Sequence, residues 1–579
     1  MFLLVTTTLF AVWFVSSAHR LYTNYRSAKL TGFPIVVCPV NPQNLLYVLV
    51  NAPLRPWLMR NLPPVVYNRF KVCTFGWQFF DRHQFHDAVG PVFVLVTTGV
   101  NQIWIADPAI AQVVLTRRKD FRTVLVTKQV MSLAGTNMIA SDDEPWARQR
   151  RLIAPQLNER VSALVWAESM QQAIAMADYL SDDSKGKEKE TVSSLRSIAI
   201  NVLGQVGYGQ PKPFRPLHLP RDPKAPMAYI DAVSLATELI VFAAFVPHKL
   251  LTLPIMPRLL QTLGVAMRRM PQLTADMLEQ ERQRNQSNCE ADAITLTEKT
   301  ETPRRETIMG LMVRLSDKQK EEEELGVEPT GGSGAGFLTE DEIHGNLFLV
   351  TGAGFDTTAN TMSYAVVMLA VHEDKQRWIQ EEVDSVFSQL DERPPGADVT
   401  ELYYALYPKL VRCLAFVNEC LRLYPPIMHI SRETNRDQTI TAHGQTHVLV
   451  GHYEVYVNNA ALQTRAAFWG DDTDEFKPQR WISVDENGDE EVIAPKRGTF
   501  TPWSAGPRVC PGQKMAQVEI VVVFATLLWR CRVRPVRKDG ETLQHAHARI
   551  MAVAGDSQPR MTLQMNRPDD LLLTWEKRR

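Results

Sequence analysis

The chain has 579 residues, of which 45% are apolar and 22% charged, and its formal net charge at pH 7 is −1. This composition is typical of a globular protein with a large core, and the balanced charge argues against a nucleic-acid or other polyanionic partner. The seven cysteines are widely spaced and include no CxxC pair. That pattern disfavours a disulfide framework, a zinc ribbon and thioredoxin-like chemistry, and it favours a reducing compartment.

The first 18 residues, MFLLVTTTLFAVWFVSSA, carry no charged side chain. They just reach the roughly 18–20 residues that a helix needs to span a bilayer. Basic residues follow only on the C-terminal side, at Arg20, Arg26 and Lys29, whereas a cleaved signal peptide would carry one before its apolar run. By the positive-inside rule, the sequence predicts a signal anchor over residues 1–18, with the body of the protein in the cytosol.

A basic, proline-rich hinge is expected over residues 19–40 and one large folded domain over residues 41–579. A strand-like run, VFVLVTT, occupies residues 92–98, and from about residue 103 the pattern becomes mainly helical. The apolar stretch 236–264 is interrupted by three prolines, which argues against a second membrane span. A substrate lid or membrane-dipping surface explains this stretch as well as an ordinary buried helix pair does.

Residues 285–336 are polar and end in a segment rich in glutamate and glycine, so they are predicted to form a flexible loop. The sequence has neither a GxGxxG pattern before a helix nor a GxxxxGK[ST] pattern, and thus offers no dinucleotide or nucleoside triphosphate site of its own. After the loop, Thr339 and Glu342 form a capping-box pattern. We expect a helix of about thirty residues to start there and cross the core.

Inside that expected helix, AGFDTT at residues 353–358 places a glycine, an acid and two hydroxyls among apolar residues. Gly354 costs up to about 1 kcal/mol relative to alanine in a helix interior, and close approach of a flat ligand would explain it. Asp356 and Thr357 are then candidates for a proton-relay pair. A solvent-facing aspartate with two threonines bonded back to helix carbonyls fits the same residues equally well.

Glu419 and Arg422 lie one helical turn apart in FVNECLRLYPP. On a surface helix such a pair is worth only about 0.2–0.5 kcal/mol, and taken alone it fits that ordinary explanation. The flanking residues are apolar, however, and a buried pair would need a third partner. Arg480 in FKPQRW is a candidate, because its planar guanidinium can bind the second face of Glu419.

Trp146 and Arg150 lie four residues apart in EPWARQRR, on one face of an expected helix whose first turn holds Pro145. Together they can bind a carboxylate or phosphate group of a ligand. A basic surface helix is the alternative explanation.

The stretch WSAGPRVCPG at residues 503–512 places Cys510 in a tight turn that Gly506 permits. Arg508 stands two residues before the cysteine, and Pro511 is suited to start the helix that follows. A cysteine at a helix N-terminus beside an arginine is expected to ionise readily to the thiolate. A thiolate in a rigid turn is either a nucleophile, which needs a base such as histidine nearby, or a metal ligand.

In their order and spacing, these four motifs together resemble the cytochrome P450 haem-thiolate monooxygenases. The resemblance implies the fold of that family, mainly α with small β-sheets, and makes residues 41–579 the catalytic domain. It assigns Cys510 as the axial ligand of haem b, with Trp503 where phenylalanine is commoner. It also assigns Asp356 and Thr357 as the acid and alcohol that deliver protons.

Glu419, Arg422 and Arg480 are similar to the buried triad that supports the haem-binding loop in this family. In this chain PQRW replaces the more usual PERF-like sequence, so Gln479 stands where an acid is common and weakens the expected ionic network.

Further residues match the family's contacts with the haem. Trp146 and Arg150 resemble the helix residues that bind a haem propionate, and Arg432 and Arg508 stand where further propionate contacts are found. Gly354 matches the glycine at which the helix passes the haem.

The resemblance implies insertion of one oxygen atom from O2 into a lipophilic small organic substrate, by hydroxylation, epoxidation or multistep oxidation. The chain lacks a dinucleotide fingerprint, and only 579 − 510 = 69 residues follow Cys510. Electrons are therefore expected from NADPH through a separate cytochrome P450 reductase, with cytochrome b5 as a further partner. The N-terminal anchor resembles that of microsomal fungal members. It implies a single-pass protein of the endoplasmic reticulum membrane, in contact with lipid, that tailors a secondary metabolite.

Two other functions would use part of the same set of residues. A haem-thiolate isomerase or dehydratase, which rearranges a peroxide without external electrons, would not need the Asp356–Thr357 pair. A membrane-anchored binding protein that has lost haem would not need Cys510 or Arg508. The substrate pocket is expected to be largely apolar, with His429 either orienting a polar group of the substrate or simply packing.

Overall fold

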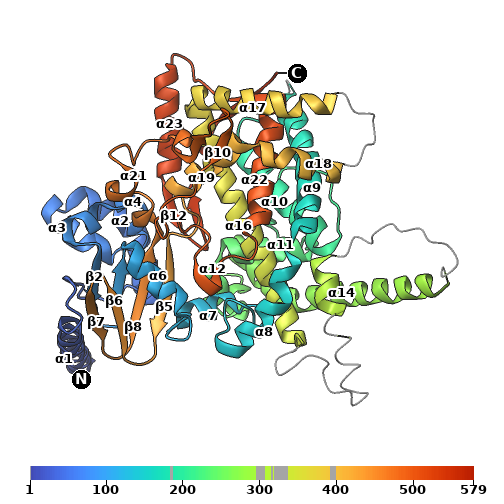
Figure 1. Cartoon of the computed structure of the whole chain (residues 1–579). Helices are drawn as coiled ribbons and strands as arrows, with labels where there is room; N and C mark the ends of the chain where they lie inside the picture. The colour runs from blue at the N-terminus through green and yellow to red at the C-terminus, as the bar shows by residue number, and fades with distance from the viewer. Residues whose placement is uncertain are drawn as a thin grey trace. The chain divides into compact units, whose positions relative to one another are not determined.

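The computed structural model describes residues 2–182, 187–294, 307–314, 317, 337–391 and 399–578. The chain divides into two compact units, which are described separately. Unit 1 comprises Met1–Val124, Arg422–Glu475 and Pro495–Cys510, and unit 2 comprises Leu125–Leu421, Phe476–Ala494 and Pro511–Arg579. Helices predominate and the sheets are small (Figure 1). The predicted fold class, mainly α with small β-sheets, is confirmed.

Unit 1 is built on a mixed six-stranded sheet with the strand order β1-β2-β3-β8-β5-β4. Its strands are β1 (Ile35–Val37), β2 (Val92–Val96), β3 (Asn101–Ile105), β4 (Phe121–Arg122), β5 (His429–Thr434) and β8 (Tyr453–Asn458). Strand β2 forms within the run that the sequence predicted. Every residue of β2, β3 and β8 is buried, so both faces of the sheet centre are covered.

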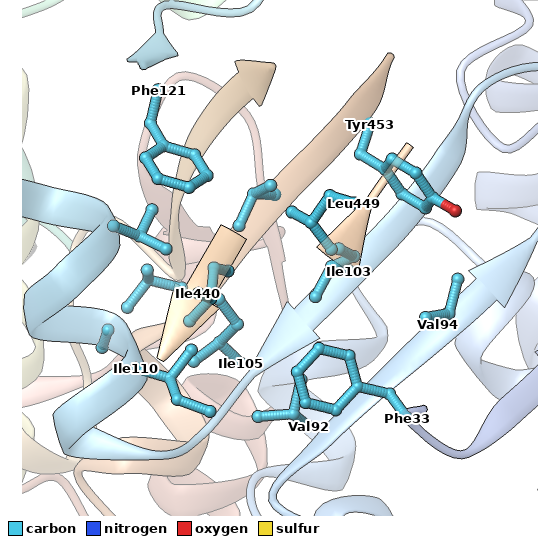
Figure 2. Packing of buried hydrophobic residues seen from close by; sticks show 14 of the residues in the cluster. Phe33, Val92, Val94, Ile103, Ile105, Ile110, Phe121, Ile440, Leu449 and Tyr453 are labelled. Atoms are coloured by element: carbon cyan, nitrogen blue, oxygen red, sulfur yellow. The ribbon is translucent and has the colours of Figure 1, made fainter. Parts of the chain in front are cut away.

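Alternating side chains of these strands lie in two separate hydrophobic clusters, because successive residues of a strand point to opposite faces of the sheet. On one face, Val92, Val94 and Ile103 pack against α6 (Pro108–Thr116) and the hairpin of β6 (Gln438–Ala442) and β7 (Gln445–Leu449). Figure 2 shows this cluster, with the side chains from the sheet, α6 and the hairpin pointing toward one another. On the other face, Phe93 and Trp104 pack with Trp77 and Phe85.

The N-terminal helix α1 (Phe2–Lys29) packs on unit 1 through its last turns. Asn24 Nδ2 donates to Thr97 O and Gly99 O at 2.9 and 2.7 Å, and Ser27 Oγ lies 2.7 Å from the Tyr453 hydroxyl. The helix continues to Lys29, into the stretch where we expected a hinge. Within the residues that the structure describes, no helix is both long and apolar enough to cross a bilayer, so the spanning helix predicted over residues 1–18 is not supported.

Unit 2 is mainly helical, with three two-stranded sheets. Its helices are α7 (Leu125–Met131), α8 (Asp143–Ile153), α9 (Glu159–Ser181), α10 (Thr191–Tyr208), α11 (Tyr229–Glu238), α12 (Ile240–Phe245), α13 (His248–Leu251), α14 (Arg258–Ile294), α16 (Glu340–Val371), α17 (Glu373–Asp391), α18 (Val399–Leu406), α22 (Gln513–Arg530) and α23 (Leu543–Gly555). The sheets pair β9 (Ile482–Val484) with β10 (Glu490–Val492), β11 (Cys531–Pro535) with β14 (Leu573–Lys577), and β12 (Ser557–Pro559) with β13 (Leu563–Met565). Helix α19 (Val411–Leu423) ends at the boundary of the two units.

Helix α16 is the long helix that the sequence predicted, with 32 residues. The capping box is present: Thr339 Oγ1 accepts from Glu342 N at 3.2 Å, and Glu342 Oε2 accepts from Thr339 N at 3.0 Å. Helices α10 and α11 pack along it, and almost all of its residues are buried. The predicted start of this helix and its place in the core are both confirmed.

The apolar stretch 236–264 is a series of short helices and not a second span, because Pro247 and Pro257 interrupt the helices. Ile255, between α13 and α14, is 86% exposed. The loop predicted over residues 285–336 lies mostly outside the described residues. Residues 285–294 continue α14 and residues 308–314 are also helical, so the prediction is wrong there. The sequence NQSNCEADAI at 285–294 holds few strong helix formers, but a helix that has already formed gains one backbone hydrogen bond with each residue that it adds.

Candidate functional site

The turn that carries Cys510 is part of unit 1 and is fixed by its backbone. Cys510 N donates to Trp503 O at 2.8 Å, which closes the turn. Gly506 has a φ of 69°, and a Cβ at this position would lie 2.6 Å from Leu115 O. Only glycine fits there, because a side chain would be strained by the left-handed backbone and would collide with the neighbouring carbonyl. The half-buried Cys510 is thus presented from a turn that permits little backbone freedom.

Two arginines of unit 1 match the predicted contacts to an anionic ligand. Arg508 Nη1 donates to Thr123 Oγ1 at 3.1 Å, which orients the guanidinium from the same turn as Cys510. Arg432 on β5 is 9% exposed, and its Nη1 donates to Ser431 O at 2.8 Å. Arginine is a frequent partner of carboxylates, because its planar guanidinium presents five N–H donors.

In unit 2, Trp146 and Arg150 lie on α8, where the sequence predicted a helix. Trp146 is buried against Met131, Met138 and Leu349, so α8 is not the solvated basic helix of the alternative explanation. Arg150 is half-buried one turn further along.

Helix α8 is fixed to the start of α16 by Glu342, a buried carboxylate of the capping box. Arg148 Nη1 donates to Glu342 Oε2 at 2.9 Å and Gln149 Nε2 donates to Glu342 Oε1 at 3.1 Å. Asn346 Nδ2 then donates to Gln149 Oε1 at 2.9 Å. Sequence reasoning assigned Glu342 to the cap alone and missed that it also orients the helix carrying Trp146.

The loop before α8 is pressed onto the same end of α16. A Cβ on Gly345 would collide with Thr136 O, so this glycine is required by close packing of the two backbones. Asp341 Oδ2 accepts from Thr136 N at 2.9 Å, and these hydrogen bonds hold the pKa of Asp341 below its usual value. Asn346 Oδ1 accepts from Met138 N at 3.1 Å. The only signal for this arrangement in the sequence is a glycine in the first turns of a helix.

One face of α16 remains open in the middle of the helix. Between residues 345 and 370 every residue is buried except Val350, Ala353, Gly354 and Thr357, which follow the spacing of a single helix face. A Cβ on Gly354 would meet only Leu203, at an ordinary 3.6 Å. The packing of the protein itself therefore does not demand a glycine at 354, and the open stripe leaves room for a flat ligand.

Asp356 points away from this open face and is completely buried, so it is not the solvent-facing aspartate of the alternative explanation. Its Oδ2 accepts from Thr562 Oγ1 at 2.6 Å and from Gln564 Nε2 at 3.1 Å, and its Oδ1 accepts from Gln564 Nε2 at 3.1 Å. Arg196 Nη1 lies 3.8 Å from Oδ1. The hydroxyl of Thr357 instead donates back to Ala353 O at 2.7 Å. The expected relay residues are neighbours in sequence whose side chains bond to different partners.

Glu419 is fully buried and is bound by the segment that contains Arg480. Its Oε1 accepts from Arg480 Nε at 3.0 Å and from Lys477 N at 2.9 Å, and its Oε2 accepts from Trp481 Nε1 at 2.9 Å. A buried carboxylate is tolerated only with such partners. The sequence pointed to Arg480 and missed Trp481 and the backbone of Lys477.

Arg422, one turn after Glu419 on α19, is also fully buried. Its guanidinium donates to Gln463 O, Thr473 O and Glu475 O at 3.0, 2.6 and 3.1 Å within unit 1. Neither residue of the pair is therefore on a solvent-exposed helix surface. Arg422 binds three backbone carbonyls of the segment that follows α20 (Asn459–Leu462).

His429 begins β5 in unit 1 and meets the rings of Trp104 and Tyr456 edge-on, with centroids 5.4 and 5.0 Å away. Burial lowers the pKa of the imidazole to about 4, so the ring is neutral near pH 7. Within the described part of the chain, Nδ1 is buried and has no hydrogen-bond partner.

The residues of unit 1 fit an iron tetrapyrrole with two propionates, because they include a thiol on a rigid turn and two arginines. Unit 2, taken by itself, presents an open face of α16 that suits a flat ligand, and it carries a tryptophan and an arginine on α8. A cysteine thiolate is an established ligand of haem iron, and arginine is the preferred partner of carboxylates.

Comparison with known proteins agrees with this fit. The sequence model of the family Cytochrome P450 matches residues 60–556. A phomenoic acid biosynthesis cluster cytochrome P450 monooxygenase of Leptosphaeria maculans is 30% identical, over 90% of each chain. Cytochrome P450 monooxygenases of Arthrobotrys oligospora and Penicillium roqueforti are 24% and 26% identical, over 95% and 87% of this chain and 94% and 87% of theirs. The chain belongs to the cytochrome P450 monooxygenase family, whose members bind haem through a cysteine thiolate.

Proposed function

We propose that this protein inserts one oxygen atom from O2 into a lipophilic small organic substrate, with electrons from NADPH delivered by a separate reductase. The observation that carries the proposal is the glycine-constrained turn around Cys510, in a chain whose family binds haem through a cysteine. In this role Cys510 is the thiolate ligand. Such a ligand pushes electron density to the iron and favours cleavage of the O–O bond.

In unit 1, Arg432 and Arg508 would neutralise propionate carboxylates of the haem. In unit 2, Arg150 is suited to the same role, and Trp146 would donate its indole N–H. Glu419 and Arg480 have a supporting role, because their buried ion pair fixes the segment around residue 480 to α19.

Proton delivery is assigned to Thr357 and Asp356. The Thr357 hydroxyl lies on the open face of α16, where it would be a proton donor on the cofactor side after turning from Ala353 O. Asp356 lies one residue earlier and restores the proton through water. The isomerase alternative has no use for this pair, and no observation favours it.

A lipophilic substrate is supported by the apolar surface beside the open helix face. Met131, Met138, Trp146 and Leu349 form a cluster, against which Ala353, Ile139 and Met561 pack. In unit 1, the buried Nδ1 of His429 is suited to one hydrogen bond with a polar group of the substrate. The name of the Leptosphaeria relative ties that protein to a biosynthesis cluster, which supports a role for this chain in making a secondary metabolite.

Association with the endoplasmic reticulum membrane, with the catalytic part in the cytosol, is a further part of the proposal. Its support is the exposed apolar surface of α1, where Leu9, Phe10 and Trp13 are 62–65% exposed. Leu250 and Ile255, between α12 and α14, are also exposed. Soluble proteins rarely leave such groups of large apolar side chains in water.

The proposal is tested by turnover with purified reductase, NADPH and isotopically labelled O2, using lipophilic scaffolds as substrates. We expect one labelled oxygen atom in the product, and no product from Cys510→Ser. Cys531→Ser, which changes a buried cysteine of β11, is the matched control and should retain activity. Conversion of a hydroperoxide without NADPH, and with no incorporation of label, would instead support the isomerase.

A further inference from the structure

The carboxylate of Asp356 is held by a short segment close to the C-terminus. Gln564 lies in β13 (Leu563–Met565) and Thr562 directly precedes this strand, and the side chains of both reach the same carboxylate. Thr562 is 1% exposed and Gln564 4%, and both meet the fully buried Asp356. Nothing local in the sequence links these residues, since Thr562 follows Asp356 by 206 positions.

The direction of each hydrogen bond in this cluster is fixed by the neighbours. Asn360 Nδ2 donates to Thr562 Oγ1 at 2.9 Å, which leaves the Thr562 hydroxyl proton for Asp356. Arg560 Nη1 lies 3.4 Å from Gln564 Oε1, which orients the amide so that its Nε2 faces Asp356. Every described group bonded to the carboxylate is a donor. These hydrogen bonds fix the orientation of the carboxylate.

The same segment reaches the apolar surface of the site. Met561, directly before Thr562, packs against the cluster that contains Trp146, Leu349 and Ala353. Met561 Cε would also lie 3.9 Å from a Cβ on Gly352. The side chains that bind Asp356 therefore belong to a segment that lines the open face of α16.

We propose that Thr562 and Gln564 are positioning residues for proton delivery, because their hydrogen bonds hold the carboxylate of Asp356 turned toward β13. This inference rests on the proposed monooxygenase function. The carboxylate takes one proton from a solvent hydronium ion, which is left as water. It would pass this proton to the Thr357 oxygen as the Thr357 hydroxyl gives its own proton to the proton acceptor on the open face of α16, and it then returns to the bonds with Thr562 and Gln564. The cycle leaves the four side chains unchanged and moves one proton from solvent to the open face.

The test compares Thr562→Val, which keeps the shape and removes the hydroxyl donor, with Thr562→Ser, which keeps the donor. With reductase, NADPH and a turned-over substrate, we expect the fraction of NADPH converted to product to fall about fivefold or more in Thr562→Val. Its pH profile should shift, and Thr562→Ser should restore both. Gln564→Leu should behave like Thr562→Val. The spectrum of the reduced carbon monoxide complex should be normal in all three variants.

A double-mutant cycle separates positioning from a structural role. In an Asp356→Asn background, Thr562→Val should cause no further loss of coupling, because the group that it positions is already disabled. Equal losses in both backgrounds, or wild-type coupling and pH profile in Thr562→Val, would overturn the inference. Failure of the wild-type protein to give a thiolate-type spectrum would overturn the proposed function instead, so the two failures are distinguishable.

Discussion

The turn around Cys510 in unit 1 and the polar cluster around Asp356 in unit 2 are held in place by different means. The turn is constrained by backbone: a hydrogen bond from Cys510 N to Trp503 O and a left-handed Gly506 pressed against Leu115. The acid is constrained by side-chain donors from a segment more than two hundred residues away. Substitutions in the turn should therefore destabilise the protein by straining the backbone. Substitutions at the buried acids should do so by removing hydrogen-bond partners.

The largest effect is expected at Glu419, the other buried carboxylate that distant donors hold. Glu419→Ala removes the acceptor of Arg480 Nε, Lys477 N and Trp481 Nε1, and leaves a guanidinium that is 10% exposed without its counter-charge. We expect the free energy of unfolding to fall by about 3–5 kcal/mol, measured by urea denaturation. Glu486→Ala, at an exposed site, is the control. A loss below about 1 kcal/mol would mean that the cluster does not hold the fold together.

Gly506→Ala tests the backbone constraint of the turn. Its control is Gly488→Ala, because Gly488 is also left-handed, with a φ of 91°, but has nothing within 4 Å of its Cβ position. Both variants carry the strain of roughly 1–2 kcal/mol of a left-handed alanine. Only Gly506→Ala adds a collision with Leu115 O, worth about 1–3 kcal/mol more. Unfolding and haem content should both be affected more by Gly506→Ala, and equal behaviour of the two variants would contradict the account of the turn.

Thr357→Val tests the proton-donor role of the Thr357 hydroxyl separately, because it leaves both the turn and the buried cluster intact. We expect a normal carbon monoxide spectrum and about a tenfold loss in the fraction of NADPH converted to product, since a positioned proton donor is missing. The control is Thr361→Val, whose hydroxyl also bonds back to a helix carbonyl. Full coupling in Thr357→Val would remove this residue from the mechanism.

The smallest effect is a pH dependence at His429. Because burial lowers its folded pKa to about 4 from 6.5, the unfolded state binds the proton more tightly between these values. The stability is therefore complete above about pH 6.5 and is lost as the pH falls toward 4. His429→Phe should remove this dependence, so the variant gains about 2 kcal/mol relative to the wild type between pH 7.5 and pH 5. Parallel stability curves for the two proteins would show that His429 is not buried in solution.

The sequence could predict what is local. The capping box at Thr339, the length of α16 and the fold class follow from periodicity and end signals, and the structure has them. Short motifs with fixed spacing predicted three of the candidate site residues: Cys510, Glu419 and Trp146.

The partners of those residues could not be predicted, because they come from distant segments. Thr562 and Gln564 lie in a hairpin with no motif, and Glu342 has a second role that depends on where α8 packs. The polar run after residue 285 was predicted to be loop because its composition resembles a linker, yet α14 continues to Ile294, because extending a formed helix is more favourable than starting one. The membrane span over residues 1–18 was predicted from length and flanking charge alone, and the structure does not support it.

The central claim, that Cys510 presents a thiolate to haem iron, is tested most directly by the absorption spectrum of the reduced, carbon monoxide-bound protein. The account predicts a thiolate-type Soret shift in the wild type and in Cys531→Ser, and its loss in a folded Cys510→Ser that still binds haem. A wild-type protein that is well folded and haem-loaded but shows no such shift, or a Cys510→Ser variant that keeps it, would contradict the account.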